Sequence, residues 1–225
     1  MTFKIYFLLF IIYSILGWII EVIATSKDTK CFVNRGFLVG PYCPIYGACS
    51  LIMILIIPKF KSIILLFIIT MLICSIIEYV TSYIMEKLFK ARWWDYSHVP
   101  FNLNGRICLK NSLYFGLLGV LLVRYVNPLV YNYLEIMSTN IVNVLFYIIL
   151  IIFITDVIIS FKVIFKIKET AKFIKKDNTK EITEKVKLIL SNSYLTKRLL
   201  NAFPTFKIII RDIERKIRGK KLKTR

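Results

Sequence analysis

Histidine and acidic residues are scarce in this sequence. His98 is the only histidine, and 13 aspartates and glutamates stand against 32 lysines and arginines. A metal site built from several histidines is therefore excluded. The cysteines are odd in number and include no Cys-x-x-Cys pair, so we interpret them as small apolar residues and not as a disulfide framework. They are Cys31, Cys43, Cys49, Cys74 and Cys108.

Three catalytic motifs are also missing. The sequence has no Gly-x-x-x-x-Gly-Lys-Ser/Thr loop, so this chain does not bind ATP in the P-loop manner. It has neither a Gly-x-Ser-x-Gly elbow nor a His-Glu-x-x-His pair. These absences exclude the corresponding mechanisms but leave other membrane enzymes open.

Long apolar runs dominate what the sequence does contain. It is 57% hydrophobic, against about 45–50% for a soluble domain, and a spanning helix needs about 20 mostly apolar residues. The runs predict an all-α, polytopic transmembrane bundle of about five spanning helices, of which the fourth is interrupted by Arg124 and Pro128. The expected spans are residues 4–26, 40–58, 62–86, 111–131 and 140–163.

Lysine and arginine are distributed unevenly around these runs. With the N-terminus outside, the outer segments hold Lys4, Lys59 and Lys61, whereas the inner loops hold most of the other basic residues before the tail. Positive residues favour the cytoplasmic side. We therefore expect a multi-pass protein of the plasma membrane, with the N-terminus outside, the C-terminus in the cytoplasm and residues 1–165 as the transmembrane domain.

Residues 166–225 form a strongly basic segment, with 19 basic and 6 acidic residues. Phe203, Phe206 and Ile209 begin a series of apolar residues at helical spacing, with basic residues between them. We predict a basic helical cytoplasmic tail whose amphipathic part contacts anionic lipids. A solvated extension is the alternative. Only the charge points to nucleic acid, and we expect none as a partner.

Two predicted spans carry carboxylates. Glu21 lies near the inner end of the first span, and Glu78, Ser82 and Glu86 follow at helical positions i, i+4 and i+8, so they form one stripe. Ionisable groups inside a membrane are costly and mark candidate sites. If Glu21 and Glu78 converge, they could bind a divalent cation or share a proton. The alternative is that Glu21 and Glu86 only mark the membrane interface.

The segment of residues 34–47 leads into the second predicted span. Asn34 and Arg35 are followed by two glycines, and Pro41 and Pro44 suit the first turn of a helix. The free N–H groups at such a helix start favour an anion, and Arg35 would lie nearby. The alternative is a plain turn before a helix.

A second loop on the same side of the membrane is also rich in polar residues. Arg92, Asp95, Asn102 and Arg106 occur within fifteen residues, beside two tryptophans. Arginine pairs with carboxylates or holds a phosphate through two hydrogen bonds. A belt of aromatic residues at the headgroup level is the alternative. We expect His98 to be a loop residue and not a base.

Arg124 and Asp156 occupy the last two spans, which a short outer loop makes antiparallel neighbours. Their depths predict a structural ion pair. The alternative is that Arg124 extends towards the membrane surface. We assign no metal ligands.

These same stretches resemble a bacterial family, the putative ABC-transporter type IV proteins. The resemblance covers about residues 10–130. It implies a permease-like membrane protein that works with a separate ATPase. It rests on Gly17-Trp18 with Glu21, Asn34-Arg35-Gly36-Phe37, Gly40-Pro41, Cys43-Pro44-Ile45-Tyr46-Gly47, Glu78-Tyr79 with Thr81-Ser82, Arg92-Trp93-Trp94-Asp95-Tyr96-Ser97 and Gly105-Arg106-Ile107.

Three functions follow as hypotheses. The first is a permease-like transport component whose polar site opens to the cytoplasm, with Glu21 and Glu78 as the ion or substrate groups. The second is a membrane enzyme acting on a phospholipid or a polyprenyl phosphate, in which arginines hold phosphate and a carboxylate acts as base or binds Mg²⁺. The third is a non-catalytic assembly subunit. A homo-oligomer is compatible with each hypothesis.

Overall fold

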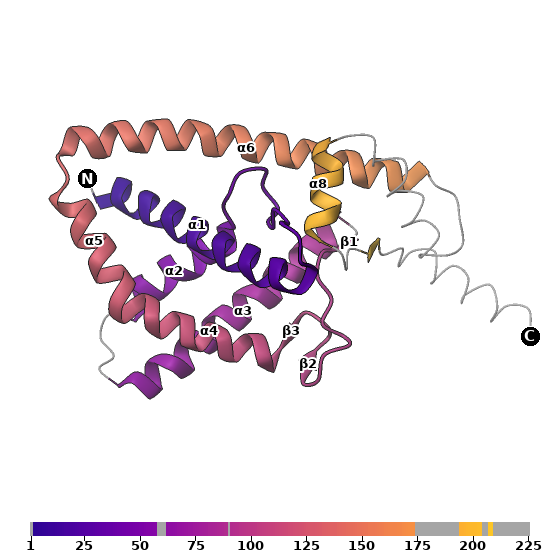
Figure 1. The fold of residues 1–225 in the computed structure, drawn as a ribbon, viewed down its shortest axis with the longest axis horizontal. Helices are drawn as coiled ribbons and strands as arrows, with labels where there is room; N and C mark the ends of the chain where they lie inside the picture. Colours follow the sequence, from indigo (N-terminus) through magenta and orange to yellow (C-terminus); the bar gives the residue numbers. More distant parts are fainter. Residues whose placement is uncertain (1, 58–61, 90, 174–193, 204–206, 209–225) are drawn as a thin grey trace, which may run out of the picture.

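The protein is mostly helical over the residues that the structure, a computed structural model, describes: 2–57, 62–89, 91–173, 194–203 and 207–208. The predicted all-α bundle is confirmed, and the strands are only two residues long (Figure 1). In chain order the elements are α1 (Thr2–Thr29), α2 (Pro44–Ile56), α3 (Ile63–Phe89), β1 (Ala91–Arg92), β2 (Asn102–Leu103), β3 (Ile107–Cys108), α4 (Leu109–Leu121), the π-helical turn η1 (Leu122–Val126), α5 (Asn127–Ile136), α6 (Thr139–Phe173), α8 (Tyr194–Ala202) and β4 (Lys207–Ile208).

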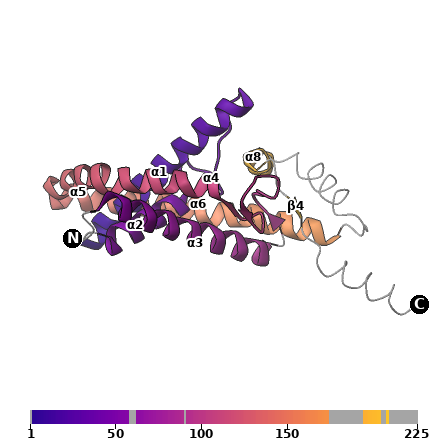
Figure 2. The ribbon, with the colours of Figure 1, turned by 90° about the horizontal axis from the view of Figure 1, so that it is seen from below.

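Four helical stretches within the described residues are long and apolar enough to cross a membrane, which makes the chain a multi-pass membrane protein. Figure 1 places the N-terminus and the turn between α5 and α6 at one end of the molecule, and α8 and the small strands at the other. In Figure 2 the last turns of α1 diverge from the other helices. The four stretches are Thr2–Lys27, Ile63–Phe89, Leu109–Ile136 and Thr139–Phe165.

The second predicted span, residues 40–58, is shorter in the structure. Helix α2 has 13 residues, about 20 Å of helix, which is too short to cross a bilayer alone. Pro44 occupies the first turn of α2, where its missing N–H leaves no intrahelical bond unmade. Pro41 disfavours helix at the residue before it, so the chain stays irregular up to Pro44.

Residues 30–43 run back alongside α1 instead of forming helix, and we call them the re-entrant loop. The Cys43 N–H donates a hydrogen bond of 2.9 Å to the carbonyl of Ser14. Ser14 lies about 20 Å along the helix axis from Lys27, where the first span ends. Helix α2 therefore begins deep beside α1, and the re-entrant loop with α2 forms the second crossing in two parts.

The fourth predicted span is one continuous helical rod despite its proline. Helix α4 passes through η1 directly into α5. Pro128 has no N–H, and its ring crowds the carbonyl four residues earlier. The π-helical turn before it widens the helix locally and relieves that crowding.

Small residues let the helices approach closely, as is typical of membrane bundles. A Cβ on Gly47 of α2 would lie 2.4 Å from the backbone oxygen of Phe10 and 2.3 Å from Oγ of Ser14. A Cβ on Gly119 of α4 would similarly meet Thr70 of α3 at 2.4 Å. The α1–α2 and α3–α4 contacts therefore depend on glycine.

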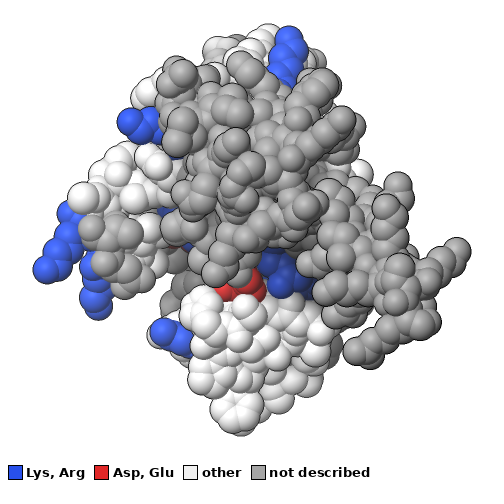
Figure 3. All heavy atoms as spheres, turned by 90° about the vertical axis from the view of Figure 1, so that its right-hand side faces the viewer, with Lys and Arg blue, Asp and Glu red and all other residues white. Residues whose placement is uncertain are grey.

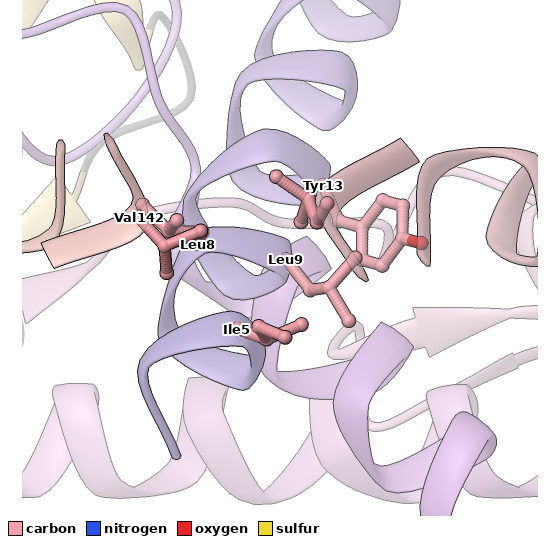
Figure 4. Packing of buried hydrophobic residues seen from close by; sticks show 6 residues of the cluster. Ile5, Leu8, Leu9, Tyr13 and Val142 are labelled. Carbon is pink, nitrogen blue, oxygen red and sulfur yellow. The ribbon is translucent and has the colours of Figure 1, made fainter. Parts of the chain in front are cut away.

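The apolar core centres on the first half of α1 (Figure 4). The Tyr13 hydroxyl extends from this cluster and donates to the side-chain oxygen of Asn127 on α5 at 2.9 Å. Helix α1 is thereby fixed to both of the last two spans. The buried members are Ile5, Leu8, Leu9, Tyr13, Leu134 and Val142.

The C-terminal segment differs in part from the predicted tail. Helix α6 continues through the predicted boundary at 165/166 to Phe173. Helix α8 lies against the transmembrane part, and its Thr196, Leu199 and Ala202 side chains are buried. Residues 207–208 form a strand paired with β1 where we predicted helix. The rest of the amphipathic series, 204–206 and 209–225, lies outside the described residues.

Gly47→Ala is expected to destabilise the protein by about 1–3 kcal/mol, because the added methyl group overlaps the α1 backbone and must separate the two helices. Thermal unfolding of the detergent-solubilised protein would measure the effect. Ala24→Val, which adds carbon atoms at an exposed position of α1, is the control. Equal unfolding temperatures for the two variants would contradict the proposed helix contact.

Candidate functional site

Most of the predicted site residues gather at the α8 end of the molecule. Figure 3 looks onto this end, where lysine and arginine atoms lie around the edge and acidic atoms appear beside basic ones near the centre. Behind this surface the charged side chains form two separate groups. One surrounds Glu21 and Glu78, and the other surrounds Glu86.

Glu21 is held between two elements of the second crossing. Its Oε1 accepts a 2.7 Å hydrogen bond from the Tyr46 hydroxyl, and its Oε2 lies 3.4 Å from Nε of Arg35. The Glu21 side chain is 31% exposed. A Cβ on Gly17 would lie 2.2 Å from the Tyr46 ring, so only glycine at this position lets Tyr46 cross α1 and reach Glu21.

Glu78 is 7% exposed and only half satisfied. Its Oε1 accepts a 3.3 Å hydrogen bond from the Tyr96 hydroxyl, whereas its buried Oε2 has no hydrogen-bond partner among the described residues. Burial and the neighbouring Glu78 carboxylate raise the pKa of Tyr96, so its hydroxyl stays protonated and can donate.

The carboxylates of Glu21 and Glu78 lie within electrostatic range of each other and of Tyr46, and each accepts a hydrogen bond from a different tyrosine hydroxyl. We call Glu21, Arg35, Tyr46, Glu78 and Tyr96 the glutamate site. The described residues contain no group of three or more His, Cys, Asp or Glu side chains placed to hold a metal ion. Two carboxylates and two tyrosine oxygens suit a proton or a singly charged cation better than a divalent metal.

The second group, which we call the arginine network, lies at the end of α3 and in the loop after it. Oε2 of Glu86 accepts a hydrogen bond from Nη2 of Arg92 at 3.0 Å and forms an ion pair with Nη2 of Arg106 at 2.8 Å. Arg92 also lies 3.5 Å from Asp95, and Arg106 donates to the Ser82 hydroxyl at 3.2 Å. Two guanidinium groups therefore match two carboxylates, which is the arrangement of a structural ion cluster.

A tight hairpin turn supports this network. Asn104 and Gly105 both adopt positive φ, and the Arg106 N–H closes the turn onto the Leu103 carbonyl at 3.0 Å. The side chain of Asn102 accepts the Gly105 N–H at 2.9 Å. A Cβ on Gly105 would lie 2.7 Å from Asp95, so the asparagines and the glycine shape the loop that carries the arginines.

Asn34 fixes the re-entrant loop. Its side-chain oxygen accepts the Trp18 indole N–H at 2.8 Å, and its amide donates to the Val39 carbonyl at 3.2 Å. Both ends of the amide thus serve the fold. The start of α2 lies beside Glu21 and not beside a free arginine, which does not favour the predicted anion.

Asp156 serves the re-entrant loop and not Arg124, the partner predicted from the sequence. It accepts the N–H groups of Val39 and Gly40 at 2.9 and 2.6 Å and the Tyr42 hydroxyl at 2.5 Å. These donors satisfy the charge of the carboxylate within α6. Arg124 lies on η1 with an exposed side chain.

Sequence reasoning missed several residues that complete these groups. Tyr46 and Tyr96 lie inside the motifs, where their position beside polar residues was a usable signal. Arg198 on α8 donates to the carbonyls of Gly36 and Leu38. Its segment shows only a high density of basic residues, which does not single out one arginine.

Glu86→Gln is expected to lower the free energy of unfolding by about 3–5 kcal/mol, because it leaves the buried guanidinium group of Arg106 and the half-buried one of Arg92 short of one carboxylate. Tryptophan fluorescence during thermal unfolding would report the loss. Glu135→Gln makes the same chemical change at an exposed position of α5 and is the control. An unfolding temperature of Glu86→Gln equal to that of the control would show that the network is not stabilising.

Comparison with known proteins places these features in a family. No curated protein and no solved structure matches the chain. A family model described as "Putative ABC-transporter type IV" matches residues 8–161. The match runs from α1 through most of α6, includes the glutamate site and the arginine network, and ends before α8. The chain, a multi-pass membrane protein, therefore belongs to the putative ABC-transporter type IV family.

Proposed function

We propose that this protein is a permease-like component of a membrane transport system, and that its glutamate site binds a cationic group. The observation that carries the proposal is the buried Oε2 of Glu78, which has no hydrogen-bond partner among the described residues. A carboxylate oxygen left in this state within a span is costly. A proton or a bound cation removes that cost, so the site favours one or the other.

The charges around the site support a cationic occupant. Arg35 lies against Glu21 and also contacts the Ala202 carbonyl and the Phe203 ring, so its charge is already shared. Of the residues that the structure describes, only the neutral Tyr96 hydroxyl donates a hydrogen bond to Glu78. The site therefore carries an excess negative charge when both glutamates are ionised, and its oxygen atoms are the ligands that alkali and ammonium ions prefer.

The position of the site suits access from one side of the membrane. Glu21 is partly exposed, whereas Glu78 lies about 12 Å deeper than Glu86 along α3. The distribution of lysine and arginine supports placing this end in the cytoplasm. ATP hydrolysis would come from a separate subunit, because this chain has no P-loop.

The enzyme hypothesis receives less support from the geometry. It requires arginines that can hold a phosphate, and both Arg92 and Arg106 are bound to Glu86. An assembly subunit would need the glutamates only for packing. Cations would then leave the stability of the protein unchanged, whereas they would stabilise a protein that binds them.

Glu78→Gln is expected to abolish a cation response and, without cations, to unfold at the same or a higher temperature than the wild type. The amide keeps the shape but removes the buried charge. The protein in lipid nanodiscs would be unfolded thermally in the presence of K⁺, Na⁺, ammonium, choline or spermidine. A cation that binds only the folded state raises the unfolding temperature.

The control is Glu135→Gln on the exposed face of α5, which should respond to the cation as the wild type does. A wild type indifferent to every cation in the series, or a Glu78→Gln variant that responds equally, would refute the cation site. A strongly destabilised Glu78→Gln variant would favour the assembly hypothesis.

A further inference from the structure

Helix α8, which lies beyond the family match, contacts the re-entrant loop directly. In Figure 1 it lies at the end of the molecule where α1 ends and β1 begins. Nη2 of Arg198 donates to the carbonyls of Gly36, at 3.1 Å, and Leu38. On the other side of the same loop, Asp156 accepts the N–H groups of Val39 and Gly40. The loop backbone is therefore held between an arginine of the tail and an aspartate of α6.

Helix α8 also contacts the glutamate site itself. Nη1 of Arg35 donates to the carbonyl of Ala202, the last residue of α8, while Nε of Arg35 faces Glu21. A cation at the C-terminal carbonyls of a helix is favourable. The Phe203 ring then lies 5.7 Å from the Arg35 guanidinium and 5.1 Å from the Trp93 ring. One arginine thus joins the tail to the candidate binding residue.

We propose that α8 is an intramolecular lid on the re-entrant loop: docked, it holds the loop in place and fixes Arg35 beside Glu21, and undocked, it releases both. Arg198 is the positioning residue that holds the lid in place. The proposal goes beyond the cation site. It rests on the proposed function only in that the glutamate site next to the lid is taken to bind a cation. The contact between α8 and the loop stands on its own geometry.

The construction of the lid suits reversible docking. Helix α8 has only nine residues, too few to be stable as an isolated helix in water. Its order comes from the contacts that it makes, chiefly the buried Leu199 and the Arg198 hydrogen bonds. Loss of a few contacts would therefore release the whole element.

A native cysteine reports on the lid. Cys43 ends the re-entrant loop and is buried, and a Cβ on Gly36 would lie only 3.3 Å from its Sγ, so the loop covers the thiol. Cys31 is exposed and would be replaced by serine, whereas Cys74 is buried in the α2–α3 core and serves as an internal control.

The test measures the rate at which a maleimide labels Cys43 in the Cys31→Ser protein in nanodiscs, with site assignment by mass spectrometry. Arg198→Ala is expected to accelerate labelling of Cys43 about tenfold and to leave Cys74 protected. Lys197→Ala removes the same charge from the exposed neighbouring position of α8 and should label as the parent protein does. Arg198→Lys should be intermediate, because lysine keeps the charge and the donor hydrogens but lacks the planar guanidinium that places Nη2 against both carbonyls.

The direction in which the labelling rate of Cys43 changes distinguishes undocking of α8 from the mere loss of a charge. A cationic side chain near a thiol favours the thiolate, which is the reactive form, so loss of the Arg198 charge alone would not accelerate labelling. If Cys43 in Arg198→Ala were labelled no faster than in Lys197→Ala, the lid proposal would be wrong. Equal acceleration at Cys74 would overturn it too, because Arg198 would then stabilise the whole bundle. No cation is needed, so failure of the cation site leaves this test intact.

Discussion

A membrane interior offers no water to unpaired backbone groups, and the rest of this structure depends on how the re-entrant loop meets that constraint. Asp156 accepts the N–H groups of Val39 and Gly40, Arg198 donates to the carbonyls of Gly36 and Leu38, and Asn34 joins one part of the loop to another. Because these partners come from α6, α8 and the loop itself, the arrangement of the irregular backbone depends on the assembled bundle and on the docked position of α8. The re-entrant loop in turn positions helix α2 and its Tyr46 side chain.

The charged residues divide into those that are matched and those that are not. In the arginine network two guanidinium groups face two carboxylates around a rigid hairpin, so the group holds the loop after α3 in one arrangement. In the glutamate site the positive charge of Arg35 is shared, and one oxygen of Glu78 has no hydrogen-bond partner within the described part of the chain. Stability and the proposed binding thus reside in neighbouring but separate sets of side chains, which is the usual relation between a scaffold and a site.

Much of the fold could be predicted from apolar length and charge alone. Four of the five predicted spans correspond to helices of full length, and even Pro128 did not interrupt the fourth. The second predicted span is too short in the structure to cross a bilayer as one helix. Its sequence is as apolar as the others, and only Pro41 and Pro44 indicate that the residues before α2 are not helical. The partner of Asp156 could not be predicted, because backbone N–H groups occur at every position and leave no trace in a sequence. Arg198 could not be singled out among the many basic residues of the C-terminal segment.

The contact between Arg198 and the re-entrant loop also sets an order of events during synthesis. The carbonyls of Gly36 and Leu38 belong to the first helical hairpin, but their partner is made after every transmembrane helix. During translation the loop must therefore bind water or the insertion machinery in place of the tail. A part of the membrane domain that precedes most of the transmembrane helices in the chain thus reaches its final arrangement only after α8 has been made.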